Sequence, residues 1–442
     1  MGTEITLDVG GVAVTYSKNH RGMDHGSIFQ EQDLKAVRSD QINYEWYEEN
    51  DENPESHEMA FTRPLRHVAP RLELLGFNLE RVRREYGVIA SEWKGREFYL
   101  REGEEEFPPI EPMSFMEFMN FAIVHPVGSL DDTFVSPSSG HESAAQIQVR
   151  FKGKGIERIP AYGLSSSPSF SEREFFIRLI NILHPYSVLR ILAEAEANKN
   201  AAVVWQYGPL VEAGWAAERE FFPNARRTET FLIATEGSSD VHILRHALAL
   251  LRPEVADFFR FIDVSESHPF SGTGSLVKFA EGLAKIDVQN QVLFVFDNDA
   301  EGLEAHQRLS TLMLPGNMRS VMLPQLEEFC SFPTRGPEGV HHTDINRRAA
   351  AIECYLDLNA GNHPPAKIRW TNYKKNLDTY QGALEFKEGY YKQFLKQTRE
   401  SLDRGTYDVR KIEAVLDYLI AECVAIVVDQ FDPTDVEPLN LF

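Results

Sequence analysis

The sequence predicts three successive regions: an α+β domain over residues 1–225, an α/β domain with a mostly parallel, helix-flanked sheet over 226–325, and a helical extension over 326–442. Two observations predict this order. After Thr228, short apolar runs alternate with stretches of helical spacing, which is the pattern of βαβ units. Before Thr228, apolar and polar residues alternate around turn residues, and no regular βαβ order is visible.

The composition is that of a globular protein with a large negative charge. Hydrophobic residues make up 43% of the 442 residues and charged residues 25%, so the chain can bury a core and is not mainly disordered. A formal charge of −22 excludes a general nucleic-acid coat protein, because phosphate binding needs positive charge. It does not exclude an enzyme that holds metal ions with carboxylates and binds phosphates through one basic patch.

Cysteine usage and hydropathy predict a cytoplasmic protein without membrane contact. The three cysteines, Cys330, Cys354 and Cys423, are far apart in the sequence, which argues against a disulfide scaffold and against a thiolate zinc site. The first residues lack the pattern of a signal peptide. The most apolar late stretch, residues 415–428, is too short to span a bilayer.

In the first domain, alternating apolar residues predict a β-hairpin around Gly10-Gly11 and a second hairpin over residues 89–100, turning at Lys94-Gly95. Residues 40–58 contain eight acidic side chains and neither Lys nor Arg, which is typical of a solvated loop. The Ser-, Gly- and Pro-rich stretch 128–144 also predicts a loop. Helical spacing covers residues 72–86, 171–195 and 210–221.

In the α/β domain, the apolar runs predict four strands, and three helical stretches separate them. The strands are expected at residues 230–234, 259–264, 291–296 and 318–323, and the helices at 241–251, 276–286 and 302–312. The continuous apolar run at 291–296 fits a sheet that is covered on both faces. Beyond Pro324 we expect a helix over 346–358 and further helices from Asn376 onward.

Acidic residues directly follow two of the predicted strands. The first strand leads into Glu236 and Asp240, and the third leads into Asp297 and Asp299. The carboxyl ends of parallel strands lie at one edge of a sheet, where ligands bind. Carboxylates at this edge can hold Mg²⁺, and a pair of such ions can activate water and stabilise the leaving oxygen of a phosphodiester. Alternatively, Asp240 and Asp299 serve only as helix caps.

These two acidic motifs resemble the signatures of the TOPRIM domain. The matching residues are Glu236-Gly237-x-x-Asp240 and Asp297-x-Asp299-x-x-Gly302, and the resemblance covers roughly residues 228–323. It implies a metal-dependent phosphotransfer fold in which Glu236 acts as acid/base or metal ligand. Asp297 and Asp299 would then hold Mg²⁺ or Mn²⁺, with two ions expected.

TOPRIM domains occur in topoisomerases, bacterial primases, recombination proteins and overcoming-lysogenization-defect (OLD) nucleases. The cysteines cannot build the zinc module of a primase, and no large DNA-gate domain of a topoisomerase is visible. The ATPase of OLD nucleases requires a Walker A loop, and the sequence contains none. A stand-alone nuclease fits best.

Further residues could support this chemistry. The loop around Gly272, Gly274 and Ser275, followed by Lys278, could bind phosphate, or it is an ordinary loop. The resemblance to OLD-type domains implies Glu353 as a further metal ligand and Lys387 as the lysine that stabilises the transition state. Solvated helix faces are the alternative for both.

Residues 367–411 form a basic stretch in an otherwise acidic chain. Eleven basic side chains outnumber six acidic ones, and Trp370, Tyr373 and Tyr380 lie among them. This composition makes Lys374 and Lys375 candidates for nucleic-acid contact. Arg335 and His341 match the broad spacing of the HEPN ribonuclease motif, and we interpret that match as chance because they lie on a Pro/Gly-rich loop.

The first domain resembles a family found at the head of proteins that carry a HEPN or a TOPRIM domain. The resemblance rests on residues 7–30 and 63–77. It implies a role in bacterial defence against phage and allows a partner protein from the same defence operon. We therefore expect a metal-dependent nuclease acting on DNA or RNA. The alternative is a non-catalytic TOPRIM module that senses a nucleotide or a partner, and homo-oligomerisation stays open.

Overall fold

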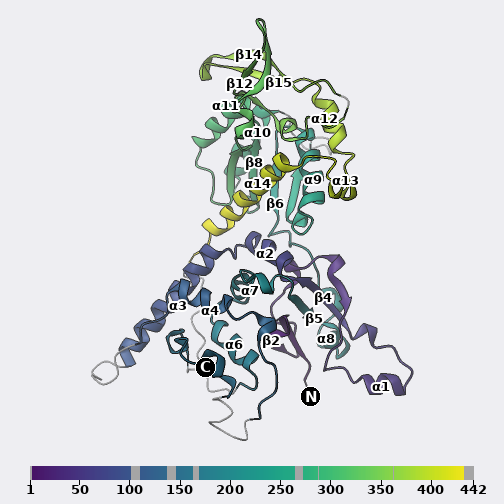
Figure 1. Ribbon diagram of the computed structural model, residues 1–442, viewed down its shortest axis with the longest axis vertical. Helices are drawn as coiled ribbons and strands as arrows, with labels where there is room; N and C mark the ends of the chain where they lie inside the picture. Colours follow the sequence, from purple (N-terminus) through teal and green to yellow (C-terminus); the bar gives the residue numbers. More distant parts are fainter. Residues whose placement is uncertain are drawn as a thin grey trace. The chain divides into compact units, whose positions relative to one another are not determined.

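The computed structural model describes residues 2–100, 110–136, 146–162, 169–263, 272–286, 288–361 and 363–432 (Figure 1). Its contacts divide into two compact units. Unit 1 contains the chain up to Ala225 together with the described residues after Gln430, and unit 2 is Arg226–Gln430. Each unit is described by itself below.

Unit 1 is built on an antiparallel sheet of five strands in the order β2-β1-β5-β4-β3. The strands are β1 (Glu4–Val9), β2 (Val12–Lys18), β3 (Leu34–Ala36), β4 (Met59–Pro64) and β5 (Ala202–Gln206). The hairpin predicted around Gly10-Gly11 is confirmed. Both glycines have a positive φ, 57° and 82°, which is the conformation that a tight hairpin turn requires.

Helices surround this sheet: α1 (Tyr44–Glu49), α2 (Leu65–Leu74), α3 (Leu79–Leu100), α4 (Phe115–Ile123), α6 (Glu172–Ile180), α7 (Pro185–Leu192) and α8 (Gly208–Glu212). The apolar faces of all of them except α1, which has no buried residue, complete the core of unit 1. Among the described helices, none is by itself long and apolar enough to cross a membrane. The pair α6 and α7 meets that test only when taken together, with a bend of 112° between them.

The second predicted hairpin, at residues 89–100, is wrong: this stretch is the second half of α3. Ile89, Trp93 and Glu97 are buried at intervals of four residues, which places them on one helix face. Strong helix formers around them outweigh the alternation that suggested strands. Gly95 has no neighbour within 4 Å of its missing side chain, so it is tolerated on the exposed face.

Other helix predictions for unit 1 are correct in part. The helical stretch 72–86 is divided between α2 and α3 at Gly76, whose φ is 87°. The single helix predicted at 171–195 is two helices, because His184 caps a new helix that begins at Pro185. The stretch 210–221 holds only the short α8 and one 3-10 turn, Glu218–Glu220. In the predicted loop at 128–144, residues 131–136 form neither helix nor strand, and residues 137–144 lie outside the described residues.

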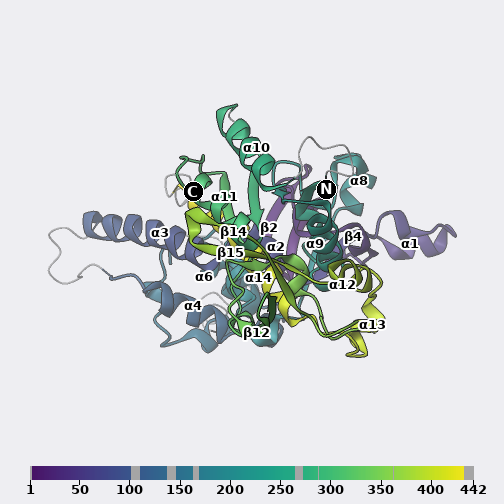
Figure 2. The same ribbon diagram turned by 90° about the horizontal axis from the view of Figure 1, so that it is seen from above.

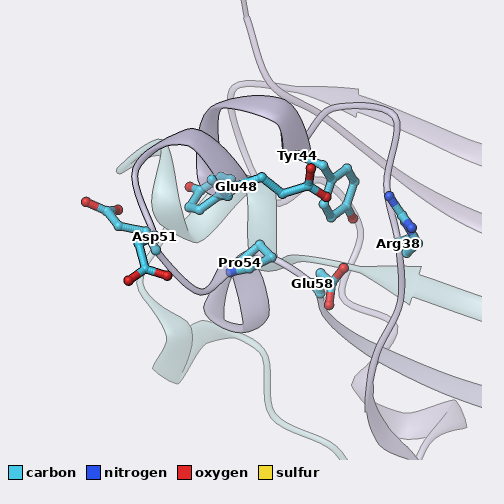
Figure 3. A pocket seen from close by; sticks show the side chains of 8 residues that line it. Arg38, Tyr44, Glu48, Asp51, Pro54 and Glu58 are labelled. Carbon is cyan, nitrogen blue, oxygen red and sulfur yellow. The ribbon is translucent and has the colours of Figure 1, made fainter.

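The acidic segment 40–58, predicted as a loop, contains α1 and a 3-10 turn at Pro54–Ser56. With Arg38 it lines an open cavity of about 490 Å³ (Figure 3). The guanidinium carbon of Arg38 lies 4.2 Å from the centre of the Tyr44 ring. The cation that this acidic, aromatic cavity attracts is therefore supplied by the chain itself.

Unit 2 contains a parallel four-stranded sheet in the order β10-β8-β6-β7. The strands are β6 (Phe231–Ala234), β7 (Phe259–Ile262), β8 (Gln291–Phe296) and β10 (Met318–Met322), so the four predicted strands are confirmed; Val264 lies outside the described residues. Five consecutive residues of β8, Val292 to Phe296, are buried, as expected for a strand covered on both faces.

The helices of this sheet are α9 (Ser238–Leu251), α10 (Thr273–Lys285), α11 (Ala300–Ser310) and α14 (Arg410–Asp429). The pairs α10–α11 and α9–α14 pack against each other. Right-handed crossovers in this strand order place α9 on one face and α10 and α11 on the other, as Figures 1 and 2 show. The three helices predicted between these strands are confirmed.

A second sheet follows, in the order β12-β11-β14-β15. Its strands are β11 (Phe332–Gly336), β12 (Gly339–Thr343), β14 (Ile368–Lys374) and β15 (Thr379–Leu384), and β14 and β15 form a hairpin. The helices predicted from Asn376 onward therefore begin only with α12 (Lys387–Phe394) and α13 (Arg399–Asp403). Within the region predicted as helical, Thr379 and Tyr380 favour a strand, and pairing with β14 holds residues 379–384 as β15.

The helix predicted at 346–358 is also wrong. This segment forms β13 (Ala349–Ala350), which pairs with β9 (Asn298–Asp299), and then a 3-10 turn at Ile352–Tyr355. The side chain of Asn298 accepts a hydrogen bond from the backbone N–H of Arg347 at 2.7 Å. A contact from a distant part of the chain thus overrides the local helical pattern.

Candidate metal centre

The carboxyl ends of β6 and β8 meet where the strand order reverses. From β6 the chain passes to β7 on one side, and it then returns to β8 and β10 on the other. Such a switch point is where open α/β sheets bind their ligands. Glu236 follows β6 and Asp297 follows β8, so both carboxylates lie at this point.

Glu236 is fixed between the two strand ends. Its Oε1 accepts a hydrogen bond from the backbone N–H of Asp297 at 3.1 Å, and its Oε2 accepts one from the hydroxyl of Thr273 at 2.6 Å. Burial, followed by the nearby charges of Asp299 and Asp240, raises the pKa of Glu236 to about 7. Near neutral pH this side chain can therefore both take up and release a proton.

Asp240 and Asp297 both follow Glu236 in the chain, Asp240 on α9 and Asp297 directly after β8. Asp297 Oδ1 accepts a hydrogen bond from the backbone N–H of Ile352 at 3.0 Å, and Asp240 Oδ2 accepts one from Gly237 at 3.0 Å. Burial and the charge of Glu353 raise the pKa of Asp240 to about 7. Burial and the charges of Asp240 and Glu236 raise the pKa of Asp297 well above its usual range.

Asp299 caps α11 and also contacts the second sheet. Its Oδ1 accepts a hydrogen bond from the N–H of Gly302 at 2.7 Å, and its Oδ2 accepts one from Nε2 of Gln381 on β15 at 2.5 Å. Burial raises the pKa of Asp299. Gly302 is required here, because a Cβ at this position would lie 2.2 Å from the carbonyl oxygen of Asp297.

Glu353 is 4% exposed and lies on the 3-10 turn that follows β13. The network around Asn298 holds this segment, since Nδ2 of Asn298 donates to Asn346 at 3.0 Å and to Tyr355 at 3.2 Å. Nζ of Lys387, the first residue of α12, lies 3.9 Å from Oε1 of Glu353. Glu353 and Lys387 therefore belong to the same cluster as the strand-end acids.

The helix that carries Lys387 is anchored to the main sheet. The hydroxyl of Tyr391, one turn after Lys387, lies 2.7 Å from Nδ1 of His242 on α9. The other ring nitrogen of His242 lies 3.1 Å from the carboxylate of Asp263, which follows β7. A side chain at the end of β7 thus takes part in positioning Lys387, although the sequence pattern did not single it out.

The cluster has the chemistry of a divalent-cation site. Five carboxylates converge, and their mutual repulsion and burial are only partly offset by Lys387. Oxygen donors with excess negative charge are the ligands that Mg²⁺ and Mn²⁺ prefer. In the described part of the chain, no three Asp, Glu, His or Cys side chains already form a coordination sphere. A cation would have to draw carboxylate oxygens away from hydrogen bonds such as Gln381–Asp299.

The predicted phosphate-binding residues begin α10. Gly272 is the residue before this helix, with a φ of 79°, and Gly274, Ser275 and Lys278 lie in its first two turns. They line an open cavity of about 800 Å³ together with residues of α11 and β14: Glu301, Glu304, Ala305, Arg308 and Lys374. Backbone N–H groups and basic side chains are thus present in one cavity beside Glu236. Ser271, which precedes this group, lies outside the described residues.

The two lysines proposed for nucleic-acid contact differ in environment. Nζ of Lys374 lies 3.0 Å from Glu301 and 3.7 Å from Glu304, so two acids balance its charge. Lys375 is exposed at the turn of the β14–β15 hairpin. Arg335 lies on β11 and His341 lies on β12. In the strand register His341 is opposite Thr334 and Arg335 is opposite Val340, so the two residues are not paired.

Sequence reasoning missed Gln381, Asn298 and Asp263. Gln381 is separated from Asp299 by more than eighty residues, so no local signal connects them. Asn298 lies between the two acids of the motif, where alternation along the strand places it on the opposite side. Asp263 lies inside the strand predicted at 259–264, and it follows the strand only because β7 ends at Ile262, so a search at the predicted strand ends would have missed it.

Comparison with known proteins gives one match. Residues 1–229, slightly more than half of the chain, match the family model described as HEPN/Toprim N-terminal domain 1. No curated protein and no solved structure matches the chain.

Proposed function

The chain belongs to the HEPN/Toprim N-terminal domain 1 family, and from this membership and the carboxylate cluster we propose that it is a TOPRIM-type nuclease that requires Mg²⁺ or Mn²⁺. A role in defence against phage is part of the proposal. This role rests on the resemblance carried by residues 7–30 and 63–77 and on the family, whose description names the HEPN and Toprim domains.

One observation carries the proposal. Glu236 and Asp297 come from separate strands, and they are joined at the switch point of a parallel sheet by a hydrogen bond of 3.1 Å. Asp240, Asp299 and Glu353 surround this pair with further carboxylates. A fold that needed only stability would not gather like charges in a buried place, because their repulsion is costly.

The residues of the site divide the work of phosphodiester hydrolysis. When bound, a pair of divalent cations would polarise the phosphoryl group and supply an activated water. Asp297, Asp299, Asp240 and Glu353 would hold them. Glu236, with a pKa of about 7, suits proton transfer at neutral pH. The ammonium group of Lys387 would stabilise the charge that develops on the phosphate.

A cleavage assay tests this proposal. Plasmid DNA, single-stranded DNA and RNA are incubated with the full chain in Mg²⁺ or Mn²⁺, beside Glu236→Gln and Asp297→Asn. We expect metal-dependent cleavage that falls by about 100-fold or more in both variants. Asp403→Asn is the matched control, since Asp403 is an exposed acid paired only with Arg399 in the described structure.

Calorimetric titration with Mn²⁺ completes the test. We expect the wild type to bind Mn²⁺ and the Asp297→Asn variant to lose this binding. Full activity of either variant would contradict the assignment of the site. A folded protein that binds Mn²⁺ and cleaves none of the three substrates would contradict the nuclease and favour the sensing module.

A further inference from the structure

The β14–β15 hairpin carries two exposed tyrosines that face each other. Tyr373 and Tyr380 are directly opposite in the strand register, and their ring centres are 5.1 Å apart. Their exposed fractions are 47% and 50%, so both rings offer a face to solvent. A cross-strand aromatic pair stabilises a hairpin, and that role does not require such exposure.

A third exposed aromatic residue follows the same hairpin. Phe386 is 55% exposed and has a φ of 59°, a left-handed conformation that is costly for a residue with a bulky side chain. It directly precedes Lys387, whose ammonium group faces Glu353. The strained backbone therefore leaves an apolar ring more than half exposed, next to the lysine that faces the carboxylate cluster.

The hairpin is joined to the candidate metal centre through its own neighbouring residues. Gln381, next to Tyr380, donates to Asp299, and Lys374, next to Tyr373, lines the cavity that also contains Lys278. Between residues 367 and 384 the chain has four basic side chains and one acid, against −22 for the whole. The exposed rings thus lie beside Lys374, whose charge Glu301 and Glu304 balance, and near the exposed Lys375 at the turn of the hairpin.

From this arrangement we propose that the hairpin binds unpaired bases, so that the substrate of the site is single-stranded nucleic acid. Bases stack on exposed aromatic rings, while lysines contact the phosphates between them. The bases of a duplex are stacked on one another and cannot reach the rings. This inference rests on the proposed function for its catalytic meaning, but the binding itself can be measured without cleavage.

The experiment measures binding by the full chain with Ca²⁺ in place of Mg²⁺, and a gel verifies that the oligonucleotide stays intact. The probe is a fluorescent DNA strand of about 20 nucleotides, longer than the roughly 4–16 that one single-strand-binding domain covers. The same strand in a duplex is the comparison. We expect at least about 10-fold tighter binding of the single strand, equivalent to about 1.4 kcal/mol.

Tyr373→Leu, Tyr380→Leu and Phe386→Leu remove the aromatic face and keep apolar bulk. Each is expected to weaken single-strand binding by about 5- to 10-fold and to leave duplex binding unchanged. Tyr16→Leu is the matched control, because Tyr16 is an equally exposed strand tyrosine of unit 1, at 61%. A probe carrying 2-aminopurine adds a stacking signal: its fluorescence is quenched by the wild type and not by Tyr373→Leu.

Equal affinity for single strand and duplex, or no binding of either, overturns the inference. So does an equal loss of both in the leucine variants, which would indicate damage to the fold or a purely electrostatic surface. Binding that prefers the single strand, without any cleavage, would support the inference and contradict the proposed nuclease activity. Cleavage that the three leucine substitutions leave unchanged would support the proposed nuclease activity and contradict the inference.

Discussion

The two units treat buried charge in opposite ways. In unit 1, the guanidinium of Arg71, fully buried, donates to the carbonyls of Ser27 and Phe29 at 2.9 and 3.1 Å. Glu85 likewise accepts hydrogen bonds from the hydroxyl of Ser187 and the backbone of His184. In unit 2, buried carboxylates instead stand beside other carboxylates, which raise the pKa of Asp297 well above its usual range.

This difference separates the parts of the molecule that build structure from the part that we propose binds metal. A buried charge with its partners satisfied fixes one conformation, and removing it is destabilising. Carboxylates that repel one another have the opposite effect on stability. A protein keeps such a cluster where a cation or a proton is to be bound.

The largest effect is expected for Arg71→Leu. The substitution leaves two buried carbonyl groups without their donor, so unit 1 should lose about 3 kcal/mol or more. Hydrogen exchange of peptides from β5 measures the loss, and peptides from β8 report on unit 2. Arg66→Leu, an exposed position on the same helix, is the control and should change stability by less than about 0.5 kcal/mol. Equal losses in the two variants would contradict this view of Arg71.

A pH dependence of unit 1 is the next largest expectation. Burial lowers the pKa of His25 to about 3, so the folded state keeps this ring neutral. Its stabilising contribution is complete above the unfolded value of about 6.5 and is lost as the pH falls toward 3. Between pH 7 and pH 5 this amounts to about 2 kcal/mol.

His25→Gln isolates this contribution. The free energy of unfolding, from denaturant titration at each pH, should fall less steeply on acidification in the variant than in the wild type. His67→Gln, on the partly exposed side of α2, is the control. Parallel pH profiles for wild type and His25→Gln would show that His25 does not govern acid sensitivity.

The smallest effect has the opposite sign and concerns unit 2. Asp297→Asn keeps an acceptor for the N–H of Ile352 and removes one repelling charge, so without metal it should stabilise unit 2 by about 1 kcal/mol at pH 8. Glu236 and Asp240 each have a pKa raised to about 7, so the metal-free wild type is more stable when these two side chains are protonated. Their contribution is complete below about pH 4 and is lost as the pH rises through 7.

Thermal unfolding in EDTA and in Mg²⁺ measures both effects. Mg²⁺ should raise the Tm of the wild type at pH 8 more than that of Asp297→Asn. Asp403→Asn, exposed and outside the cluster, should behave as the wild type. A lower metal-free Tm for Asp297→Asn would show that this carboxylate stabilises the fold, and the contrast between the units would fail.

The strands and their terminal acids could be predicted because their signals are local. β6 and β8 are continuous apolar runs, and a parallel sheet brings their carboxyl ends together whatever follows. The segments that complete the cluster could not be predicted in this way. Asn298 holds the backbone around Arg347, which lies 49 residues later in the chain. Gln381 of the β14–β15 hairpin contacts Asp299 over 82 residues, so contacts between distant parts of the chain complete the cluster.

The pattern of apolar residues was least informative where it matched both the alternation of a strand and the periodicity of a helix. In residues 89–100 the same apolar positions fit an alternating strand and one face of α3. Only the continuation of the helix from Leu79, with Val82 and Tyr86 on the same buried face, decides between them. Local alternation without a neighbouring strand to pair with is therefore a weak predictor.

The hydrogen bond between Gln381 and Asp299 would make the proposed binding of metal and the proposed binding of single-stranded nucleic acid thermodynamically interdependent. The Asp299 oxygen that a cation would take is the one that now holds β15. A cation that releases Gln381 also changes the freedom of the hairpin, and a ligand that moves the hairpin changes the affinity for the cation. By linkage the two effects are equal in size, so each ligand reports on the other.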